Sequence, residues 1–582
     1  MLLASVYLAA LWSENPSVQD LPDALVLGLF LWAYHAVLVG GFTLPLLGWS
    51  HVRGHRPPSP FASLSFVALV VVGLASINAI LRFTLSYAML RGELGFASPL
   101  GVVSFAVFAG SIPIAMWLLY RPRPFALRIG VLAALALAWA GVVAGSLDAE
   151  RPPPPPVDNL AIENPAAPPA SWSGSIPDGA PARVVLLGVD GLSWHVLAPL
   201  FAAGELPHLA MLARDGARAP LASVLPTSSP SLWSTIATGR DGAAHGIHGF
   251  SLFRLPGMHG AIGSGPIVGS SNWWNGLNRV LSAAGSLGWI EQPSFARTDR
   301  RVAALWDVAA RHGVSTGVVK WYATWPVLER GDRHFMVSDF SGRPGSVAVS
   351  RRAFAILERE REPGPDFEDG SPFRSDPWLA RYARNQNDWM GRALDLDRLL
   401  RPRLGLYYAH FTDAVQHLYW RGDARADWLY APDPDHYLRF APQVTDAYGL
   451  VDRWLGTLLE DLAPNTTVLV VSDHGFAFDG HEHHRGPEGV LLMAGPGVRR
   501  GSLATEASIF DIAPTVSRLL ELPISDELPG RVLDELLDPG LVPPARRVAA
   551  WDWFTPDESS AARSPEIERD ILDRMKELGY VN

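Results

Sequence analysis

Four uncharged, mostly apolar runs fill most of the first 150 residues, and they restrict what this chain can fold into more than any other feature. This region holds only 13 of the chain's 106 Asp, Glu, Lys and Arg residues. A membrane-spanning helix needs about 20 apolar residues to cross about 30 Å of hydrocarbon. The sequence therefore predicts a transmembrane bundle over residues 1–150, with its spans inside residues 24–52, 57–81, 94–120 and 129–147.

The first twelve residues, MLLASVYLAALW, are apolar but too short for a complete span. They are either a partial fifth helix of the bundle or a signal peptide. A signal peptide normally has a basic start and a small-residue cleavage site. Because both are missing here, the helix is the better interpretation.

The positions of arginine predict how the bundle is oriented. Loops rich in arginine stay on the cytoplasmic side of a membrane. Five arginines lie in the loop after the first predicted span and in the loop between the third and fourth spans, which assigns these two loops to the cytoplasm. Only Arg82 and Arg91, between the second and third spans, favour the opposite orientation. We therefore expect a multi-pass protein of the cell (inner) membrane, in contact with the lipid bilayer, whose C-terminal part is extracytoplasmic. The five arginines are Arg53, Arg56, Arg121, Arg123 and Arg128.

A proline-rich segment follows the bundle. Residues 152–181 contain ten prolines, five of them consecutive, which favours an extended spacer over a packed element. The predicted organisation is thus a bundle over residues 1–150, a linker over 151–181, a folded domain over 182–545 and a C-terminal extension over 546–582.

Composition excludes several classes of site. The chain has no cysteine, so disulfides, thiolate nucleophiles and cysteine-ligated zinc are ruled out. Its net charge of −10 gives no polycationic surface, and we expect no coating by nucleic acid. Nothing in the composition indicates an oligomeric state. Any metal site must use oxygen and imidazole ligands.

Three apolar runs in the predicted folded domain each lead into an aspartate. RVVLLGVDG reaches Asp190, LGLYYAHFTD reaches Asp413 and TTVLVVSDHG reaches Asp473. Such runs, alternating with helical patterns, predict an α/β domain with a central, mostly parallel sheet between helices. Ligands of these sheets bind outside the carboxyl ends of the strands. The three carboxylates are therefore expected at one edge of the sheet, although each could separately be a turn or cap residue.

Histidines accompany these aspartates. His417 follows Asp413 in DAVQH, His474 follows Asp473, and the loop HEHHRG offers His481, His483 and His484. Carboxylates and imidazoles together suit a pair of divalent ions, Zn²⁺ above all, with Mn²⁺ or Mg²⁺ as alternatives. The HEHHRG loop could also be an ordinary solvated loop.

A further segment, LPTSSPSLWSTIATG, predicts the start of a helix. Pro230 suits the first helical position and Gly239 the C-terminal stop, which makes Ser229 the predicted N-cap. The unpaired N–H groups at a helix N-terminus favour a phosphate there. A serine at this position could attack phosphorus, or it could simply cap the helix.

The motifs together resemble the type I phosphodiesterase and nucleotide pyrophosphatase branch of the alkaline phosphatase superfamily. The resemblance starts with the segment DGLSWHVLAPLF through RDGAAHGIHGF and continues through TDAVQHLYW, VVSDHGF and IFDIAPTVSRLLELP, in the family's order. It extends from about Arg183 to about Gly540. It implies a two-metal hydrolase or transferase built around a central sheet between helices.

The resemblance also implies roles for individual residues. Asp190, Asp473 and His474 would bind one metal ion together with the nucleophile, and Asp413 and His417 would bind the other with a loop histidine. That histidine would be His484, because HRGPEG best matches the family pattern, with His483 as the next choice.

The position of the nucleophile follows from the same alignment. Counting back from Thr238 and Gly239 places it at Ser229, with Thr227 as the alternative if the loop is shifted by two residues. Two departures bear on the substrate. Leu232 stands where nucleotide-cleaving members typically carry asparagine and where sulfatase relatives carry arginine, so neither nucleotide specificity nor sulfatase activity is expected.

We therefore expect a membrane-anchored, extracytoplasmic, metal-dependent phosphoester hydrolase, either a phosphodiesterase or a phosphatase. Its metal-bound serine would form a covalent phosphoseryl intermediate with a small-molecule or lipid-headgroup phosphoester. The alternative is a phosphoethanolamine or phosphoglycerol transferase acting on lipids or envelope glycans, because these enzymes share the layout of bundle and domain. A third hypothesis is a membrane-anchored binding protein without turnover.

Overall fold

The computed structural model describes residues 181–556 and, N-terminal to them, Val26 and Leu29. The predicted membrane spans, apart from those two residues, lie outside the described part of the chain. So do the linker to Ala180 and residues 557–582. Gaps within the described range fall at residues 225–226, 259–260, 264–280, 282–283, 286, 340–344, 360–376, 420–441, 464 and 477–487.

No single helix among the described residues is long and apolar enough to cross a bilayer. Helices α6 (Trp194–Ala203) and α7 (Pro207–Asp215) reach the required length and composition only as a pair, and they are bent by 101° at the break between them.

The chain divides into two compact units. One comprises Met1–Pro152, Phe253–Ile262 and Pro266–Glu291, and the other holds the rest of the chain. The second unit contains the large sheet. The strands are β1 (Arg183–Val189), β2 (Ala217–Ala222), β3 (Leu252–Phe253), β4 (Ile262–Gly263), β5 (Thr316–Val319), β6 (Phe335–Val337), β7 (Val347–Ala348), β8 (Leu404–Ala409), β9 (Thr466–Val471), β10 (Gly489–Ala494), β11 (Ser502–Leu503), β12 (Ala507–Ser508), β13 (Ile524–Ser525) and β14 (Arg547–Val548).

Ten of the described strands form one mixed sheet in the order β11-β2-β10-β9-β1-β8-β5-β6-β7, with β12 also paired to β2. The five central strands, β9, β1, β8, β5 and β6, are parallel. Antiparallel pairs start at β10 on one side and at β7 on the other. The prediction of a parallel sheet is therefore confirmed for the centre, and the whole sheet is mixed.

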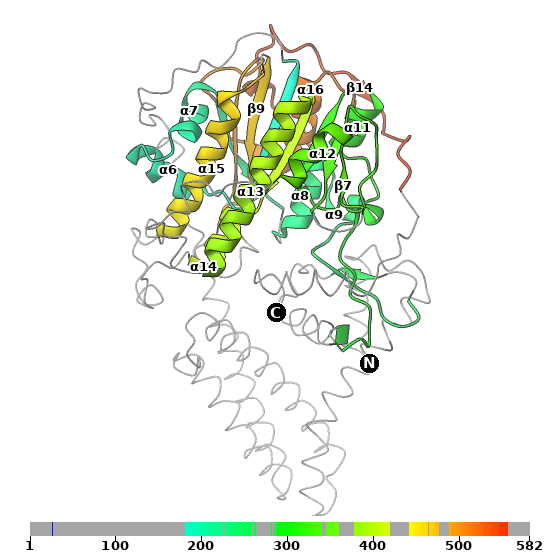
Figure 1. Cartoon of the computed structure of the whole chain (residues 1–582). Coiled ribbons are helices and arrows are strands. Elements are labelled where there is room, and N and C mark those ends of the chain that lie inside the picture. The colour runs from blue at the N-terminus through cyan, green and yellow to red at the C-terminus, as the bar shows by residue number, and fades with distance from the viewer. Residues whose placement is uncertain are drawn as a thin grey trace, which may run out of the picture. The chain divides into compact units, whose positions relative to one another are not determined.

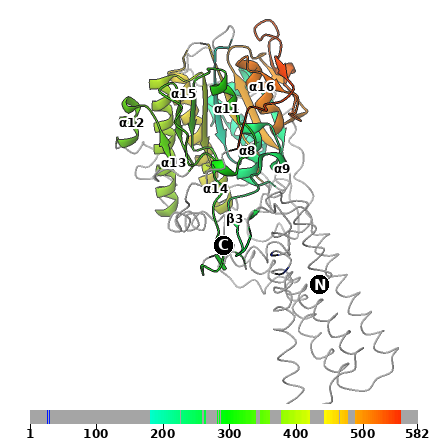
Figure 2. The ribbon, with the colours of Figure 1, turned by 90° about the vertical axis from the view of Figure 1, so that its right-hand side faces the viewer.

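The helices of this unit lie on both faces of the sheet (Figure 1). Figure 2 shows α13 and α15 on one side and α8, α11 and α16 on the other, which confirms the predicted order of layers. Besides α6 and α7, the helices are α8 (Ser229–Thr238), α9 (Gly242–His245), α11 (Leu305–Arg311), α12 (Arg351–Glu358), α13 (Pro377–Leu400), α14 (Phe411–Tyr419), α15 (Pro442–Glu460) and α16 (Ile512–Leu519).

Strand β1 shows why a continuous apolar run is needed at the centre. Successive side chains of a strand point to opposite faces of its sheet. Val185 and Leu187 belong to the core under α6, α7, α13 and α15, whereas Val184 and Leu186 belong to the core under α8, α11 and α16. Both faces are covered, so every residue of β1 is buried and a polar residue is tolerated only where the strand ends.

Candidate active site

The three predicted carboxylates lie close together because they follow three adjacent strands of the sheet. β1 lies between β8 and β9, and the register pairs Val189 with Ala409 and Gly188 with Val471. Asp190 directly follows β1, Asp473 lies two residues beyond β9, and Asp413 lies in the first turn of α14 just after β8. All three are fully buried. The expected convergence at the carboxyl ends of the strands is thus what the structure shows.

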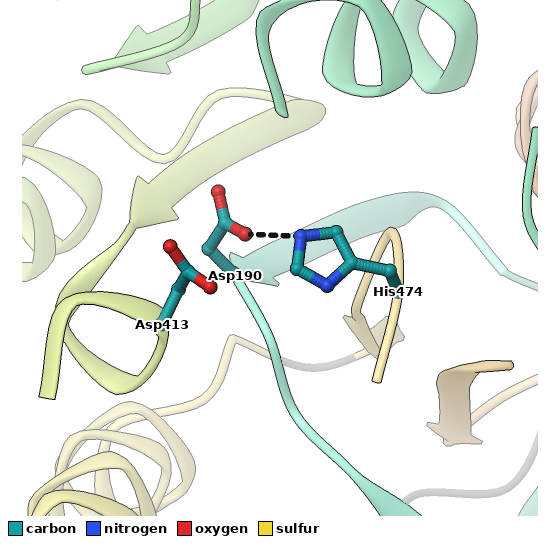
Figure 3. Close-up of side chains that lie close together, drawn as sticks. All are labelled: Asp190, Asp413 and His474. Carbon is teal, nitrogen blue, oxygen red and sulfur yellow. Dashed lines mark ion pairs between the residues drawn. The ribbon is translucent and has the colours of Figure 1, made fainter. Parts of the chain in front are cut away.

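The side chains of Asp190, Asp413 and His474 point toward one another (Figure 3). One ligand atom from each lies within 4.8 Å of the others, a spacing at which one metal ion could contact all three. His474 Nε2 lies 3.2 Å from Asp190 Oδ1 and 3.6 Å from Asp473 Oδ2. His417 Nε2 lies 3.4 Å from Asp413 Oδ2 on the next turn of α14. The loop histidines His481, His483 and His484 lie outside the described residues.

The two candidate nucleophiles lie at the start of α8. Ser229 is buried, and its Oγ hydrogen-bonds to Asp190 Oδ1 at 3.4 Å. Thr227 is also buried and lies two residues before the helix. The N-cap is Ser228 and not Ser229, because the backbone N–H of Leu232 already donates to Ser228 O. The predicted cap is wrong by one residue, and Ser229 is the first residue of the helix. Gly239 ends α8 in the left-handed region, as predicted.

An aromatic wall fixes the other oxygen of Asp190. Trp233 Nε1 donates to Asp190 Oδ2 at 3.0 Å, and the hydroxyl of Tyr408 donates to the same oxygen. The Trp233 and Tyr408 rings meet edge to face with centroids 4.9 Å apart. Gly188 leaves room for the indole, since a Cβ there would lie 2.6 Å from its Cζ3. The sequence did not predict a role for Trp233 or Tyr408, because an aromatic residue within an apolar run is normally interpreted as part of the hydrophobic core.

The turn after Asp190 is held by a second set of groups. Gly191 has φ +72°, and a Cβ at this position would lie 3.0 Å from the Cα and Cβ of Asp413. Gln416 Nε2 donates to Gly191 O at 2.7 Å, and Tyr448 in turn donates to Gln416 Oε1 at 3.0 Å. Thr412 Oγ1 donates to the carbonyl of Asp190. The turn and the start of α14 are therefore locked together, which sets the distance between Asp190 and Asp413.

The electrostatics of the cluster reflect several buried acids in one place. Burial raises the pKa of Asp473 well above its usual range, and the negative charge of Asp190 raises it further. Burial alone would lower the pKa of His474, but the charges of Asp473 and Asp190 outweigh this and raise it to about 10. The pKa of His417 is also raised, because Asp413 outweighs the effect of burial. The cluster therefore attracts positive charge.

The donor set fits a divalent cation. Both carboxylate oxygens of Asp473 are buried and accept no hydrogen bond from any residue that the structure describes. A buried carboxylate without donors is costly, and a metal ion is one of the few groups that removes this cost. Aspartate oxygens and imidazole nitrogens are ligands that Zn²⁺ and Mn²⁺ accept.

A mixed sheet between helices, with buried acids and imidazoles at its strand ends and a serine at a neighbouring helix start, has the groups that phosphoester hydrolysis requires, and its Asp/Asp/His cluster is a possible metal site. The chain belongs to the type I phosphodiesterase / nucleotide pyrophosphatase family. The sequence profile of that family matches residues 184–485, more than half of the chain. The match includes Asp190, Ser229, Asp413 and Asp473.

Several solved structures are similar to this chain. Phosphonoacetate hydrolase from Sinorhizobium meliloti 1021 is 17% identical with a TM-score of 0.33, and the alignment covers 53% of this chain and 63% of that one, less than two thirds of its length. Murine ectonucleotide pyrophosphatase / phosphodiesterase 5 is 14% identical with a TM-score of 0.35, covering 61% of this chain and all of that one. The human counterpart is 13% identical with a TM-score of 0.37 and coverage of 62% and 100%. No curated protein matches the sequence, so the family profile alone carries the assignment.

Proposed function

We propose that this protein is a membrane-anchored, two-metal phosphoester hydrolase that acts through Ser229 and a covalent phosphoseryl intermediate. The observation that carries the proposal is the position of Ser229. Its Oγ lies 3.4 Å from an oxygen of Asp190, and Asp190, Asp413 and His474 form a buried cluster with the spacing of metal ligands. A hydroxyl beside such a cluster and at the start of a helix is placed to act as a nucleophile on phosphorus.

The family resemblance, and not the spacing of the cluster, implies two ligand groups. Asp190, Asp473 and His474 would hold one ion, and Asp413 and His417 would hold the other with His484 or His483. Divalent ions bound there would supply Lewis-acid stabilisation of the charge on the phosphoryl oxygens. Zn²⁺ suits the mixture of carboxylate and imidazole best, with Mn²⁺ or Mg²⁺ as alternatives.

The chemical steps use the residues of this chain as follows. Asp190 Oδ1 accepts the hydrogen bond of the Ser229 hydroxyl and so orients Oγ. Oγ attacks phosphorus in line and the P–O bond to the leaving group breaks, so that the proton lost by Oγ is balanced by the one the leaving oxygen takes up, and a phosphoserine and a free alcohol form. Water then attacks the same phosphorus from the vacated side, which breaks the P–Oγ bond, and a proton from the water returns to Oγ to restore the serine. The N-terminal N–H groups of α8 favour the negative charge that develops beside them.

The proposal places the catalytic unit outside the cell membrane. Its support is the sequence alone: uncharged runs over residues 1–150, arginines in the loops assigned to the cytoplasm, and a proline-rich linker. The substrate is then a phosphoester on the extracytoplasmic side, either a small molecule or a lipid headgroup.

The test uses the full-length protein in detergent, freed of metal and then given Zn²⁺ or Mn²⁺. Hydrolysis of p-nitrophenyl phosphate and bis(p-nitrophenyl) phosphate is measured for wild type and for Ser229→Ala. We expect metal-dependent turnover that falls at least about a thousandfold in Ser229→Ala. Ser228→Ala is the matched control, because the Ser228 side chain makes no capping hydrogen bond and its loss should leave the rate nearly unchanged. Activity that survives in Ser229→Ala but not in Thr227→Val would move the nucleophile to Thr227.

The transferase hypothesis gives a different result in the same assay. A transferase would release little product from soluble esters but would transfer a headgroup when vesicles containing phosphatidylethanolamine or phosphatidylglycerol are added. Full turnover of the soluble diester without lipid would exclude it. Absence of both reactions in wild type would favour a binding protein without turnover.

A further inference from the structure

A cavity in the sheet-containing unit shares no residue with the candidate active site. It measures about 330 Å³ and lies among Arg297, Arg300, Asp307, Leu328, Arg330 and Phe554. This volume is at the lower end of the range for small-molecule sites. Three of its lining side chains are guanidinium groups and only one is a carboxylate.

Both oxygens of the single carboxylate, that of Asp307, already have partners within the protein. Asp307 Oδ2 pairs with Arg300 Nη2 at 2.8 Å and also accepts the backbone N–H of Ala304 at 2.9 Å, at the start of α11. Asp307 Oδ1 pairs with Arg330 Nη2. One negative charge thus faces two guanidinium groups directly, so Asp307, Arg300 and Arg330 together carry one net positive charge. Arg297 also lines the cavity, and its Nε donates to the carbonyl of Pro326 at 2.7 Å.

Two N–H donors of this cluster have no acceptor within the described part of the chain. They are the Nε groups of Arg300 and Arg330, both of them buried. The Arg300 side chain is only 4% exposed. A buried donor without an acceptor costs free energy, more so when it belongs to a charged group. Burial lowers the pKa of Arg300, Asp307 opposes this shift, and the nearby Arg330 and Arg297 add to it.

Aromatic rings hold the Arg300 guanidinium in place. Its Cζ lies 5.0 Å from the ring centroid of Phe554 and 5.6 Å from that of Trp306. A guanidinium clamped in this way is pre-organised, so it loses little side-chain entropy when it binds a planar or tetrahedral oxyanion. Leu328, which is 39% exposed, and Phe554 add an apolar wall.

We propose that this cavity is an anion-binding site for a phosphate group, in which Arg300 and Arg330 donate hydrogen bonds to the phosphate oxygens. The Nε groups of both arginines are the donors left for this, because Arg300 Nη1 already donates to the carbonyl of Val302 and the Nη2 groups of both arginines pair with Asp307. A hydrogen bond from a guanidinium to a phosphate oxygen is charge-assisted and therefore strong. The apolar wall of Leu328 and Phe554 further favours a phosphate or phosphonate that carries a small apolar substituent.

The experiment isolates this site from the metal centre. Full-length protein carrying Ser229→Ala is treated with EDTA, and binding of inorganic phosphate and of phenylphosphonate is measured by calorimetry against a chloride blank of equal ionic strength. We expect both anions to bind, with phenylphosphonate the tighter. Arg330→Gln should weaken both by about tenfold or more, because it removes a charge-assisted donor.

Matched variants keep the test decisive. Arg333→Gln removes an exposed guanidinium three residues away, which donates to Gly313 O at 2.9 Å and does not line the cavity, and its affinities should equal those of the parent protein. If Arg330→Gln does not fold, as judged by circular dichroism, Arg297→Gln replaces it with the same expected direction.

Three outcomes overturn the proposal. No binding at millimolar phosphate would show that the arginines are a purely structural ion-pair cluster. Equal affinity in the parent and in Arg330→Gln or Arg297→Gln would place the bound anion elsewhere. The sequence after Thr555 continues with the acidic residues Asp557 and Glu558, which lie outside the described residues, and their double variant tests whether they compete with a free anion. Binding seen only after Asp557→Asn with Glu558→Gln would assign the site to the chain's own tail and not to a free ligand.

Discussion

The indole N–H of Trp233 donates to Oδ2 of Asp190 over 3.0 Å, and this bond divides the two oxygens of that carboxylate between different tasks. Oδ2 is occupied by Trp233 and by the hydroxyl of Tyr408. Oδ1 is the oxygen that faces Ser229 Oγ and His474 Nε2. The aromatic wall therefore acts on the candidate metal ligand from behind and holds it in one orientation.

Removing the Tyr408 hydroxyl should weaken metal binding. Tyr408→Phe keeps the ring and its packing but deletes one of the two donors to Asp190 Oδ2. Partners of metal ligands typically contribute about 10–100-fold to metal affinity, and we expect a loss in that range together with a lower rate at limiting Zn²⁺. Both are measured by zinc titration with a competing chelator and by diester hydrolysis.

The control for this prediction is Tyr322→Phe. The Tyr322 hydroxyl lies 3.3 Å from the Tyr408 hydroxyl, so it is one step further from Asp190. A much smaller effect is expected. Equal losses in Tyr322→Phe and Tyr408→Phe would show that general packing, and not the bond to Asp190, sets the affinity.

Gly191→Ala should destabilise the protein more than an ordinary glycine substitution at positive φ. A new Cβ would lie 3.0 Å from the Cα and Cβ of Asp413, in addition to the strain of φ +72°. Gly313 has the same φ, and no atom of the described residues lies within 4 Å of the position that a Cβ would take there, so Gly313→Ala reports the strain alone, about 1–2 kcal/mol. We expect a clearly larger fall in thermal stability, and reduced zinc affinity, for Gly191→Ala only. Equal falls for both variants would contradict the importance of the close approach to Asp413.

The meeting of Asp190, Asp413 and Asp473 could be predicted because it depends on local signals. Each apolar run stops at an aspartate, and parallel strands bring their carboxyl ends to one edge. Because β9, β1 and β8 are neighbours in the sheet, the three aspartates that follow them lie in one compact cluster. The antiparallel strand β10 was not predicted, because a short buried run such as GVLLMA reads the same in either direction.

The supporting residues could not be predicted because their roles are tertiary. Trp233 lies one helical turn after Ser229, and this spacing is the one signal that could have placed it on the same face of α8. Tyr408 and Gln416 reach their partners only after β1, β8 and α14 have packed together. The arginine cavity draws on Arg297, Arg330 and Phe554, which lie in three separate segments and share no motif.

The contact between α7 and α15 predicts a pH-dependent contribution to stability. His208 Nδ1 lies 2.8 Å from Asp452 Oδ2, and that hydrogen bond raises the pKa of His208 against the lowering effect of burial. A raised histidine pKa stabilises the fold fully below the unfolded value of about 6.5, and the contribution is lost as pH rises through the folded pKa. The difference in melting temperature between wild type and His208→Gln should therefore shrink from acid to alkaline pH.

The control for this pH dependence is His312, whose pKa is lowered, first by burial and then by Arg546 and Arg311. The contribution of His312 to stability changes with pH in the opposite direction to that of His208, because the folded protein binds the His312 proton less tightly than the unfolded chain does. His312→Gln should give a difference that changes with pH in the other direction. The same slope for both variants would show that neither reflects the histidine it replaces.

Asp473→Asn should have different effects on the melting temperature of the metal-free protein and on its increase when Zn²⁺ is added. In the metal-free protein, the buried Asp473 carboxylate accepts no hydrogen bond from the described residues and is repelled by Asp190, which opposes its attraction to His474 at 3.6 Å, so its neutral amide isostere should change the melting temperature little. Added Zn²⁺ should raise the melting temperature of wild type, because a ligand that binds only the folded state stabilises it, and this increase should be largely lost in Asp473→Asn. Asp339→Asn is the matched control, since Asp339 is a buried carboxylate with a pKa raised by burial to about 6 that hydrogen-bonds to Thr324, outside the cluster. Its Zn²⁺-dependent increase should equal that of wild type. A full increase in Asp473→Asn would remove Asp473 from the set of ligands.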